Sequence, residues 1–248
     1  MKVEDINPYG KTEDKGKEVE QMFDSIAPRY DFMNTAMSFG QHKRWRNKAL
    51  KAALKEFGAD RKINILDIAT GTGDVAFRLH ELLPESMITG IDLSEGMLEI
   101  ARKKLESYTE SEQQLIAFGK GDSLSMPFHD RDFDFITVAY GVRNFSNLRK
   151  GLEEIRRVLR LGGILCIIEL SSPRGFLTSA AYKFYSGTLI PLMGKIVSGD
   201  NRAYSYLPES IAACPQREDM AALLYGAGFV EVKWKSLSFG ALTYYVAR

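Results

Sequence analysis

The spacing of apolar positions divides the chain into a helical beginning and an alternating remainder. Before residue 60, apolar side chains recur every three or four positions, which predicts two helices ahead of any strand. The first helix is expected to end at Pro28, and the second to span residues 41–57. Residues 30–34 form a polar and aromatic link between them. Residues 1–16 are polar and are expected to be a mobile or loosely docked leader.

From Ile63 onward, short apolar runs alternate with helical patterns. The expected strands are 63–69, 87–92, 114–119, 133–139 and 164–170. Helices over 73–83 and 95–107, and a third capped by Asn147, fall between them. The last of these is followed by Gly162 and Gly163, which are expected to turn the chain into the fifth strand. Such alternation predicts an α/β fold with a parallel sheet and crossover helices.

Residues 173–215 interrupt this alternation. They are rich in apolar and aromatic side chains but broken by prolines and glycines, so they are expected to be an inserted helical cap. A helix over 216–226 then leads to strands 229–236 and 241–247, with Gly240 in the turn of a closing hairpin. The chain is therefore expected to divide into four segments. Residues 1–60 hold the leader and the helices that cover the site, 61–172 form the α/β core, 173–215 form the cap, and 216–248 add the final helix and hairpin to the same domain.

Composition excludes several classes of protein. The chain has 248 residues, with 33 Lys and Arg against 32 Asp and Glu, so its net charge of +1 gives no case for a nucleic-acid binder. Its two cysteines and three histidines are scattered, and neither a metal site nor a redox motif is expected. The N-terminus does not resemble a signal peptide, and no apolar run is long enough for a membrane span. These features favour a cytoplasmic protein.

The chemistry centres on a glycine loop after the first predicted strand. That strand ends near Asp67, and Gly71-x-Gly73-x-x-Ala76 follows at the start of a helix. The glycines let a ligand approach the backbone, and the spacing also fits a dinucleotide fingerprint. A carboxylate at Asp67 suits a cationic amino-acid moiety and would repel a pyrophosphate. Asp92, which closes the second strand, is placed to accept hydrogen bonds from ribose hydroxyls. The pair therefore favours S-adenosylmethionine over NAD.

A further polar pair follows the third strand. In an open α/β sheet, ligands lie beyond the carboxyl ends of the strands, so Asp122 and Ser123 should share a crevice with Thr70, Gly71 and Asp92. A carboxylate at Asp122 could accept a hydrogen bond from an adenine amino group. The alternative is that Asp122 is only a turn residue.

Several motifs together resemble known methyltransferases. The stretch 67–73, Asp92, Gly121-Asp122 and Pro127-Phe128 resemble the class I S-adenosylmethionine-dependent methyltransferases. Two longer motifs are similar to the signatures of the quinone-biosynthesis C-methyltransferases. They are 30–34 with Ser38, His42 and Trp45, and 157–163 with 169–171, where Leu161 departs from the usual proline or valine. Residues 141–144 and 206–211 also match, and the resemblance covers the chain from about Lys17 onward.

This resemblance implies a Rossmann-like sheet of seven strands, mostly parallel, with an antiparallel last strand. It also implies a polyprenyl quinol substrate, either demethylmenaquinol or the ubiquinone precursor 2-methoxy-6-polyprenyl-1,4-benzoquinol. The residues expected to bind S-adenosylmethionine are Asp67, Thr70, Gly71, Gly73, Asp92, Leu93, Asp122, Ser123 and Tyr140. Tyr140 stands where many members of the family have a smaller polar residue.

Methylation of a ring carbon requires a phenolic proton to be removed or shared. A base or a cation near the oxygen would assist, and the candidates are His42, Arg143, Tyr30 and Asp31. His42 has a suitable unperturbed pKa. Arg143 keeps its proton, so it would stabilise the phenolate or order a water. The structural alternatives are a buried core histidine and a surface arginine.

Two other functions compete with the quinol C-methyltransferase. One is an NAD-dependent oxidoreductase that uses the same glycine loop, and the other is a non-catalytic module that keeps the nucleotide pocket. A polyprenyl tail would require transient peripheral contact with a membrane, at its inner face, which residues 173–215 are expected to provide. The choice between the two quinols and a homodimeric state are left open.

Overall fold

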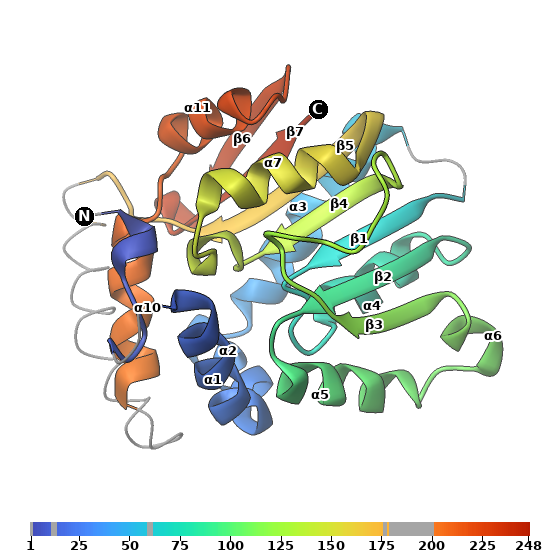
Figure 1. Cartoon of the computed structure of the whole chain (residues 1–248), viewed down its shortest axis with the longest axis horizontal. Helices are drawn as coiled ribbons and strands as arrows, with labels where there is room; N and C mark the ends of the chain where they lie inside the picture. Colours follow the sequence, from blue (N-terminus) through green and yellow to red (C-terminus); the bar gives the residue numbers. More distant parts are fainter. Residues whose placement is uncertain (1, 11–13, 59–61, 176–177, 179–200) are drawn as a thin grey trace.

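The strands of the protein form one mixed sheet. The computed structural model describes all residues except 1, 11–13, 59–61, 176–177 and 179–200. Within the described residues, the sheet has seven strands in the order β3-β2-β1-β4-β5-β7-β6 (Figure 1). The strands are β1 (Asn64–Ile68), β2 (Met87–Asp92), β3 (Ile116–Lys120), β4 (Phe133–Ala139), β5 (Leu159–Leu170), β6 (Val232–Leu237) and β7 (Leu242–Ala247). β7 pairs antiparallel with both of its neighbours, so the predicted sheet and its antiparallel last strand are confirmed.

The helices predicted over 41–57, 73–83, 95–107 and 216–226 are found close to those bounds, whereas α2 and α6 were not predicted. The α-helices are α1 (Lys15–Ile26), α2 (Tyr30–Ser38), α3 (Gln41–Phe57), α4 (Asp74–Leu82), α5 (Glu95–Leu105), α6 (Glu110–Gln113), α7 (Leu148–Val158), α10 (Asn201–Ala213) and α11 (Glu218–Gly226). Short 3₁₀ turns are η1 (Val3–Asp5), η2 (Ala27–Arg29), η3 (Val142–Asn144) and η5 (Ser238–Gly240). Ser94 and Asn147 cap α5 and α7 as expected, each accepting a hydrogen bond from a backbone N–H in the first turn.

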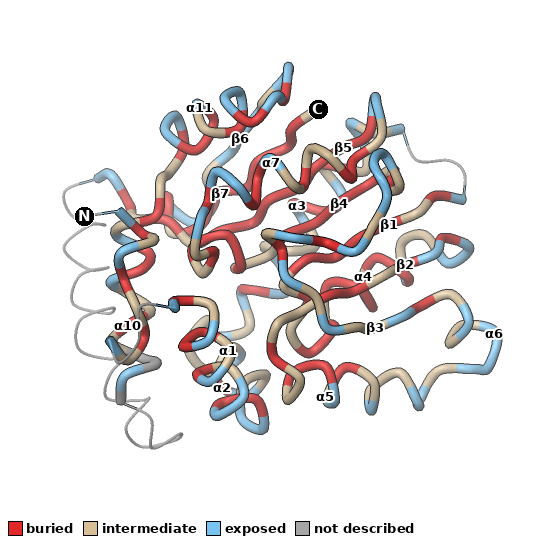
Figure 2. Tube along the Cα trace, viewed as in Figure 1, coloured by how far each residue is buried: buried red, intermediate tan, exposed pale blue. Residues whose placement is uncertain are grey.

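Two apolar layers cover the two faces of the sheet. On one face, α7 and α11 contribute side chains such as Leu152, Ile155 and Leu224 to a core with β1, β4 and β5. On the other face, α3 and α4 bury Leu50 and Val75 against the same strands. Figure 2 shows the buried positions concentrated along the strands between these layers. The sheet is therefore buried on both faces, which explains why its central strands are almost uninterrupted apolar runs.

The N-terminal segment differs most from its prediction. Residues 30–34 begin helix α2 and are not a link. The expected loose leader is docked wherever it is described. Val3 is buried in the same core as α7, and Lys15 Nζ donates to the backbone oxygens of Val3 at 2.5 Å and Arg143 at 3.0 Å. Isolated apolar residues among charged neighbours gave no periodic signal, so the sequence pattern missed this packing.

The turn expected at Gly162 and Gly163 is also wrong. Both glycines lie inside β5, which begins at Leu159 and shows an irregular register where it pairs with Phe133 and Phe135. Gly162 has a φ of 77°, and a Cβ on Gly163 would lie 2.8 Å from the Asp134 carbonyl oxygen. The glycines therefore accommodate a bulge in the strand and do not end one.

Most of the predicted cap, 173–215, lies outside the described residues. Its described end contains α10, which lies beside the N-terminal segment (Figure 1), where Arg202 Nε donates to the Pro8 carbonyl oxygen at 3.0 Å. The division into four segments remains an expectation. No helix in the described part of the chain is both long and apolar enough to cross a bilayer.

Candidate active site

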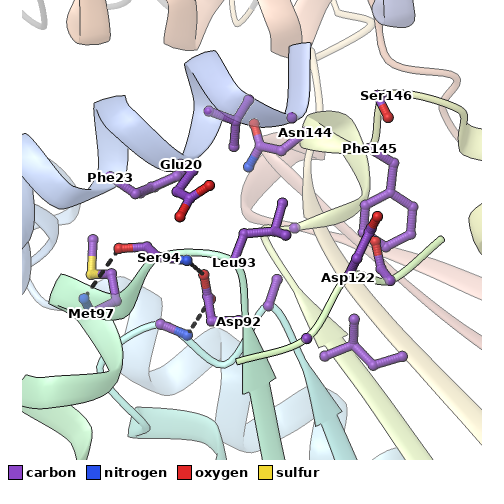
Figure 3. A pocket seen from close by; sticks show the side chains of 18 of the residues that line it. Glu20, Phe23, Asp92, Leu93, Ser94, Met97, Asp122, Asn144, Phe145 and Ser146 are labelled. Carbon is purple, nitrogen blue, oxygen red and sulfur yellow. Dashed lines mark hydrogen bonds between the residues drawn. The ribbon is translucent and has the colours of Figure 1, made fainter. Parts of the chain in front are cut away.

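One cavity lies at the carboxyl ends of β1, β2, β3 and β4. It has a volume of about 230 Å³ and is lined on one side by α1. Figure 3 shows Asp92, Leu93 and Asp122 on the sheet side of the cavity, with Glu20 and Phe23 reaching in from α1. Of the predicted cofactor-binding residues, the structure brings Gly71, Asp92, Leu93, Asp122, Ser123 and Tyr140 together here. We call this space the strand-end cavity.

Asp92 organises the glycine loop. Its Oδ2 accepts a hydrogen bond from the Gly71 backbone N–H at 2.8 Å, and its Oδ1 accepts one from Ser94 at 3.0 Å. Burial raises the pKa of Asp92, while these backbone donors favour the charged form. Gly71 has a φ of 56°, and a Cβ there would point toward the Tyr30 ring, 4.0 Å away. The loop thus presents backbone and a carboxylate to the cavity.

Asp122 has both of its expected roles in position. Its Oδ1 accepts a hydrogen bond from the Leu124 backbone N–H at 2.9 Å, as in an Asx turn, and the residue also lines the strand-end cavity. The turn fixes the direction of the carboxylate, so the same side chain makes the turn and lines the cavity.

Three predicted binding residues are not in the cavity wall. Asp67 is only 1% exposed, and it accepts hydrogen bonds from the hydroxyls of Thr70 and Thr137, both at 2.6 Å. Burial raises its pKa to about 6, against the effect of these two donors. Gly73 caps α4 with a φ of 83°, and a Cβ there would lie 2.7 Å from the Phe77 ring. Asp67, Thr70 and Gly73 therefore hold the conformation of the glycine loop and do not line the cavity.

A second cavity of about 330 Å³ adjoins the first, and we call it the helix-lined cavity. Its wall is mostly apolar and comes from α1, α2, α3 and α10, together with the carboxyl ends of β4 and β5. Four residues line both cavities: Phe23, Tyr30, Tyr140 and Asn144. A reaction between ligands in the two cavities would take place at this shared wall.

His42 lines the helix-lined cavity and has a defined hydrogen-bond partner. Its Nδ1 lies 2.6 Å from Ser38 Oγ, and that hydroxyl donates to the Asn34 carbonyl oxygen at 2.6 Å. Since the single hydroxyl proton is used there, Nδ1 must donate the proton, and Nε2 keeps its lone pair. Burial, and then the charge of Arg46, lower the pKa of His42 to about 4. The ring is therefore neutral near pH 7.

Arg143 forms a buried ion pair in the wall of the same cavity. Its Nη1 donates to Glu169 Oε1 at 2.7 Å and to the Tyr140 carbonyl oxygen at 2.6 Å. Burial alone would lower the pKa of Arg143, but the Glu169 carboxylate raises it. Within the described residues, the buried Nε has no hydrogen-bond partner. The surface alternative for Arg143 is excluded, because the residue is buried beside its carboxylate.

Tyr140 is held in a conformation that is uncommon for a residue with a side chain. Its φ is 59°, and it sits at the carboxyl end of β4 beside Ala69, which has a φ of 53° at the end of β1. The buried Tyr140 hydroxyl has no hydrogen-bond partner among the described residues. A strained backbone thus places an unsatisfied hydroxyl at the wall shared by the two cavities.

Asp31, the remaining candidate base, lines neither cavity. Its carboxylate pairs with Lys104 Nζ at 2.6 Å and accepts a hydrogen bond from Thr72 Oγ1 at 2.7 Å. It therefore ties α2 to the back of the glycine loop, and the structure does not bring it to the expected ring-binding position.

Comparison with known proteins supplies the family. The model of the ubiE/COQ5 methyltransferase family matches residues 11–248. The chain belongs to this family. The methyltransferase is 46% identical over 245 residues to a protein of Bacteroides fragilis named "Demethylmenaquinone methyltransferase", covering 98% of this chain and 97% of that one. A protein with the same name from Porphyromonas gingivalis is 43% identical over 244 residues, covering 98% of this chain and 97% of that one.

Other matches are more distant. A Geotalea uraniireducens protein named "Ubiquinone/menaquinone biosynthesis C-methyltransferase UbiE" is 38% identical over 237 residues, covering 95% of this chain and 98% of that one. Among solved structures, the [4+2]-cyclase SpnF has a TM-score of 0.65 at 21% identity, covering 91% of this chain and 76% of that one. At that identity, the likeness concerns the fold. The resemblance seen in the sequence is confirmed, and this chain is an S-adenosylmethionine-dependent methyltransferase.

Sequence reasoning missed several residues of the methyltransferase's site. Asn144 and Glu169 were part of matching motifs but were given no role. Tyr206 donates its hydroxyl to Asn144 Oδ1 at 3.0 Å, and Glu20 enters the strand-end cavity from α1. The N-terminal helices were expected to cover the site, but helical periodicity predicts only which face of α1 is apolar. It does not reveal which α1 side chains line the cavity, and the structure supplies that.

Proposed function

We propose that this methyltransferase transfers a methyl group from S-adenosylmethionine to a ring carbon of demethylmenaquinol. The observation that carries the proposal is the pair of adjoining cavities, one with carboxylates and open backbone and one mostly apolar, which share Tyr30 and Tyr140 in their wall. The names of the Bacteroides and Porphyromonas relatives agree with this substrate.

The strand-end cavity fits S-adenosylmethionine by its chemistry. Asp92 already accepts two backbone hydrogen bonds, and a carboxylate has further lone pairs that can accept hydrogen bonds from the two ribose hydroxyls. Asp122 is placed to accept a hydrogen bond from an adenine amino group, and Gly71 leaves room at the loop. When bound, the cofactor supplies an electrophilic methyl group. The protein's tasks are to align the acceptor carbon and to exclude water.

The helix-lined cavity fits the quinol ring and the start of its tail. Ionising a phenol of pKa about 10 costs about 4 kcal/mol at pH 7, so a group near the oxygen must offset this. The Arg143 guanidinium, held by Glu169, stabilises the developing phenolate, and His42 Nε2 has a free lone pair that can accept a hydrogen bond from the phenol. With a pKa of about 4, His42 is too weak a base to hold the phenolic proton itself. The unsatisfied Tyr140 hydroxyl is available to a quinol oxygen at the shared wall.

The ubiquinone precursor is a second candidate substrate, favoured by the name of the Geotalea relative. An in vitro methyl-transfer assay that offers both quinols with short tails decides between them. We expect demethylmenaquinol to be methylated with the higher kcat/KM. Methylation of neither quinol would contradict the proposal. Equilibrium dialysis with labelled S-adenosylmethionine and NAD tests the oxidoreductase alternative, which requires NAD to bind.

A further inference from the structure

The exposed phenylalanines are not spread over the molecule. Within the described part of the chain, the three exposed ones are Phe32 on α2, Phe39 at its C-terminus and Phe239 in η5, exposed by 63%, 85% and 85%. Phe39 also lines the helix-lined cavity, and so does Ala241, which directly follows η5. Phe39, and the turn that carries Phe239, therefore place two exposed aromatic side chains at the mouth of an apolar cavity.

Two of these phenylalanines are held outward by strained backbone. Phe39 has a φ of 50° and Phe239 a φ of 58°, a region in which glycine or asparagine is preferred. Trp45 connects the two turns, because it lines the same cavity and donates from Nε1 to Ser238 Oγ at 2.8 Å. An exposed phenylalanine with an unfavourable φ does not stabilise the fold. Binding of these two side chains to an apolar partner would explain why phenylalanine stands at both positions.

Helix α3, which begins two residues after Phe39, carries a concentration of positive charge. α3 carries six basic residues and one acidic residue, whereas the whole chain has a net charge of only +1. Four of the basic residues are exposed at i, i+4, i+7 and i+11, on one face of the helix, and we call them the basic stripe: Arg44, Lys48, Lys51 and Lys55. Among the ion pairs of the described residues, none involves this stripe.

We propose that the basic stripe of α3 and the exposed phenylalanines form a docking surface for an anionic lipid bilayer. Lysine and arginine side chains would meet the headgroups, and the phenylalanines would enter the boundary of the acyl chains, as in amphipathic helices that lie on membranes. The surface opens at the helix-lined cavity, so a lipid-soluble quinol could pass from the bilayer into it. This last point rests on the proposed function. A nucleic acid would use the charge but not the phenylalanines.

Vesicle co-sedimentation of the full chain tests the surface. Wild type is expected to bind phosphatidylcholine vesicles that contain one quarter phosphatidylglycerol, and to bind pure phosphatidylcholine at least tenfold more weakly. The variant R44Q/K48Q/K51Q should lose about 100-fold in vesicle affinity, since each charge near the surface contributes about fivefold. The variant F39N/F239N should lose at least tenfold, and asparagine tolerates both backbone conformations, so folding is preserved.

Matched controls lie elsewhere on the molecule. K103Q/R149Q/K150Q removes three exposed charges, and L161N/V230N removes apolar side chains that are 66% and 81% exposed at the amino-end edge of the sheet. Both controls should bind vesicles within about twofold of wild type. Equal losses for controls and test variants, or no loss for the test variants, would overturn the proposal. So would a stripe variant that loses binding of duplex DNA while keeping vesicle binding.

Activity toward a tail-less naphthoquinol separates this proposal from the proposed function. The stripe residues line neither cavity, so R44Q/K48Q/K51Q should methylate this soluble quinol at the wild-type rate. Vesicle binding without methyl transfer to any quinol would support the docking surface and contradict the proposed function. Methyl transfer without vesicle binding would overturn the docking surface alone.

Discussion

The two cavities are built in different ways, although they share a wall. The strand-end cavity takes its sheet side from loops that directly follow β1, β2, β3 and β4, so short stretches of sequence supply its polar groups. The helix-lined cavity gathers His42 from α3, Arg143 from η3 and Tyr206 from α10, which lie far apart in the chain. A binding site for a common cofactor can be local, whereas a site for a particular substrate depends on how helices pack around the sheet.

The electrostatics differ in the same way. In the strand-end cavity, the Asp92 carboxyl accepts hydrogen bonds from two backbone N–H groups, which favour its charged form against the effect of burial. In the helix-lined cavity, the polar groups are few and lie in an apolar wall. They are the Arg143–Glu169 ion pair, the neutral His42 ring and the Tyr140 hydroxyl, unpaired among the described residues, and the free energy of each depends strongly on the groups around it. Substitutions in the second cavity should therefore have larger and more specific effects.

The largest expected effect is a loss of stability when the buried ion pair between Arg143 and Glu169 is broken. Glu169→Ala leaves the Arg143 guanidinium buried without its carboxylate, which should lower the free energy of unfolding by about 3–5 kcal/mol. Chemical denaturation measures this. The double variant Glu169→Leu/Arg143→Met should recover most of the stability and still show little methyl transfer. If the double variant is as active as wild type, Arg143 has no role in the reaction.

The next largest effect concerns His42. His42→Ala should lower kcat about 10²-fold, because the hydrogen-bond acceptor for the phenol is lost, with little change in the affinity for S-adenosylmethionine. Steady-state kinetics and calorimetry measure the two quantities. His129→Ala, at an exposed position, is the matched control and should be as active as wild type. A wild-type kcat in His42→Ala would show that His42 has no role in the reaction.

A smaller effect is expected in the strand-end cavity. Asp92→Ala should weaken binding of S-adenosylmethionine by about 1–3 kcal/mol, the range for a lost hydrogen bond to a charged group, as measured by calorimetry. The quinol KM should change little. An unchanged dissociation constant for S-adenosylmethionine would show that Asp92 only supports the glycine loop through Gly71.

The smallest expected effect concerns how kcat/KM depends on pH through the protonation of His42. Burial lowers its pKa to about 4, so its neutral form persists and His42 should cause no decline in kcat/KM between pH 8 and pH 5. An ordinary histidine would produce a decline near pH 6.5. Because the folded protein binds this proton less tightly than the unfolded chain, the stability that His42 contributes above about pH 6.5 is lost as the pH falls toward 4.

An NMR titration of the His42 ring checks the same pKa directly. In Arg46→Gln, the removal of a nearby positive charge should raise the pKa, although burial remains the main cause of the shift. A pKa of His42 near 6.5 in wild type would show that the ring is solvated and that the helix-lined cavity is wetter than its lining indicates.

The sequence by itself determined the sheet, its order of helices and strands, and the family. Short apolar runs mark strands that are buried on both faces, and a period of 3.6 marks helices that are buried on one, so strands such as 87–92 and 133–139 are found at their predicted bounds. The glycine loop and the acids at the ends of β1, β2 and β3 were expected at one edge of the sheet, because the carboxyl ends of parallel strands lie at the same edge. The roles of Asp67 and Asp31 were not determined, since a carboxylate in a motif can point to either side of a loop.

Only the tertiary structure decided which side chains face a ligand. It turned Asp67 toward Thr70 and Thr137, tied Asp31 to Lys104, and paired Arg143 with Glu169, 26 positions away. It also docked the N-terminal segment, through contacts such as those of Lys15 Nζ with the backbone oxygens of Val3 and Arg143. These outcomes depend on contacts between residues distant in sequence, and their free energies come from burial and charge pairing that no local pattern encodes.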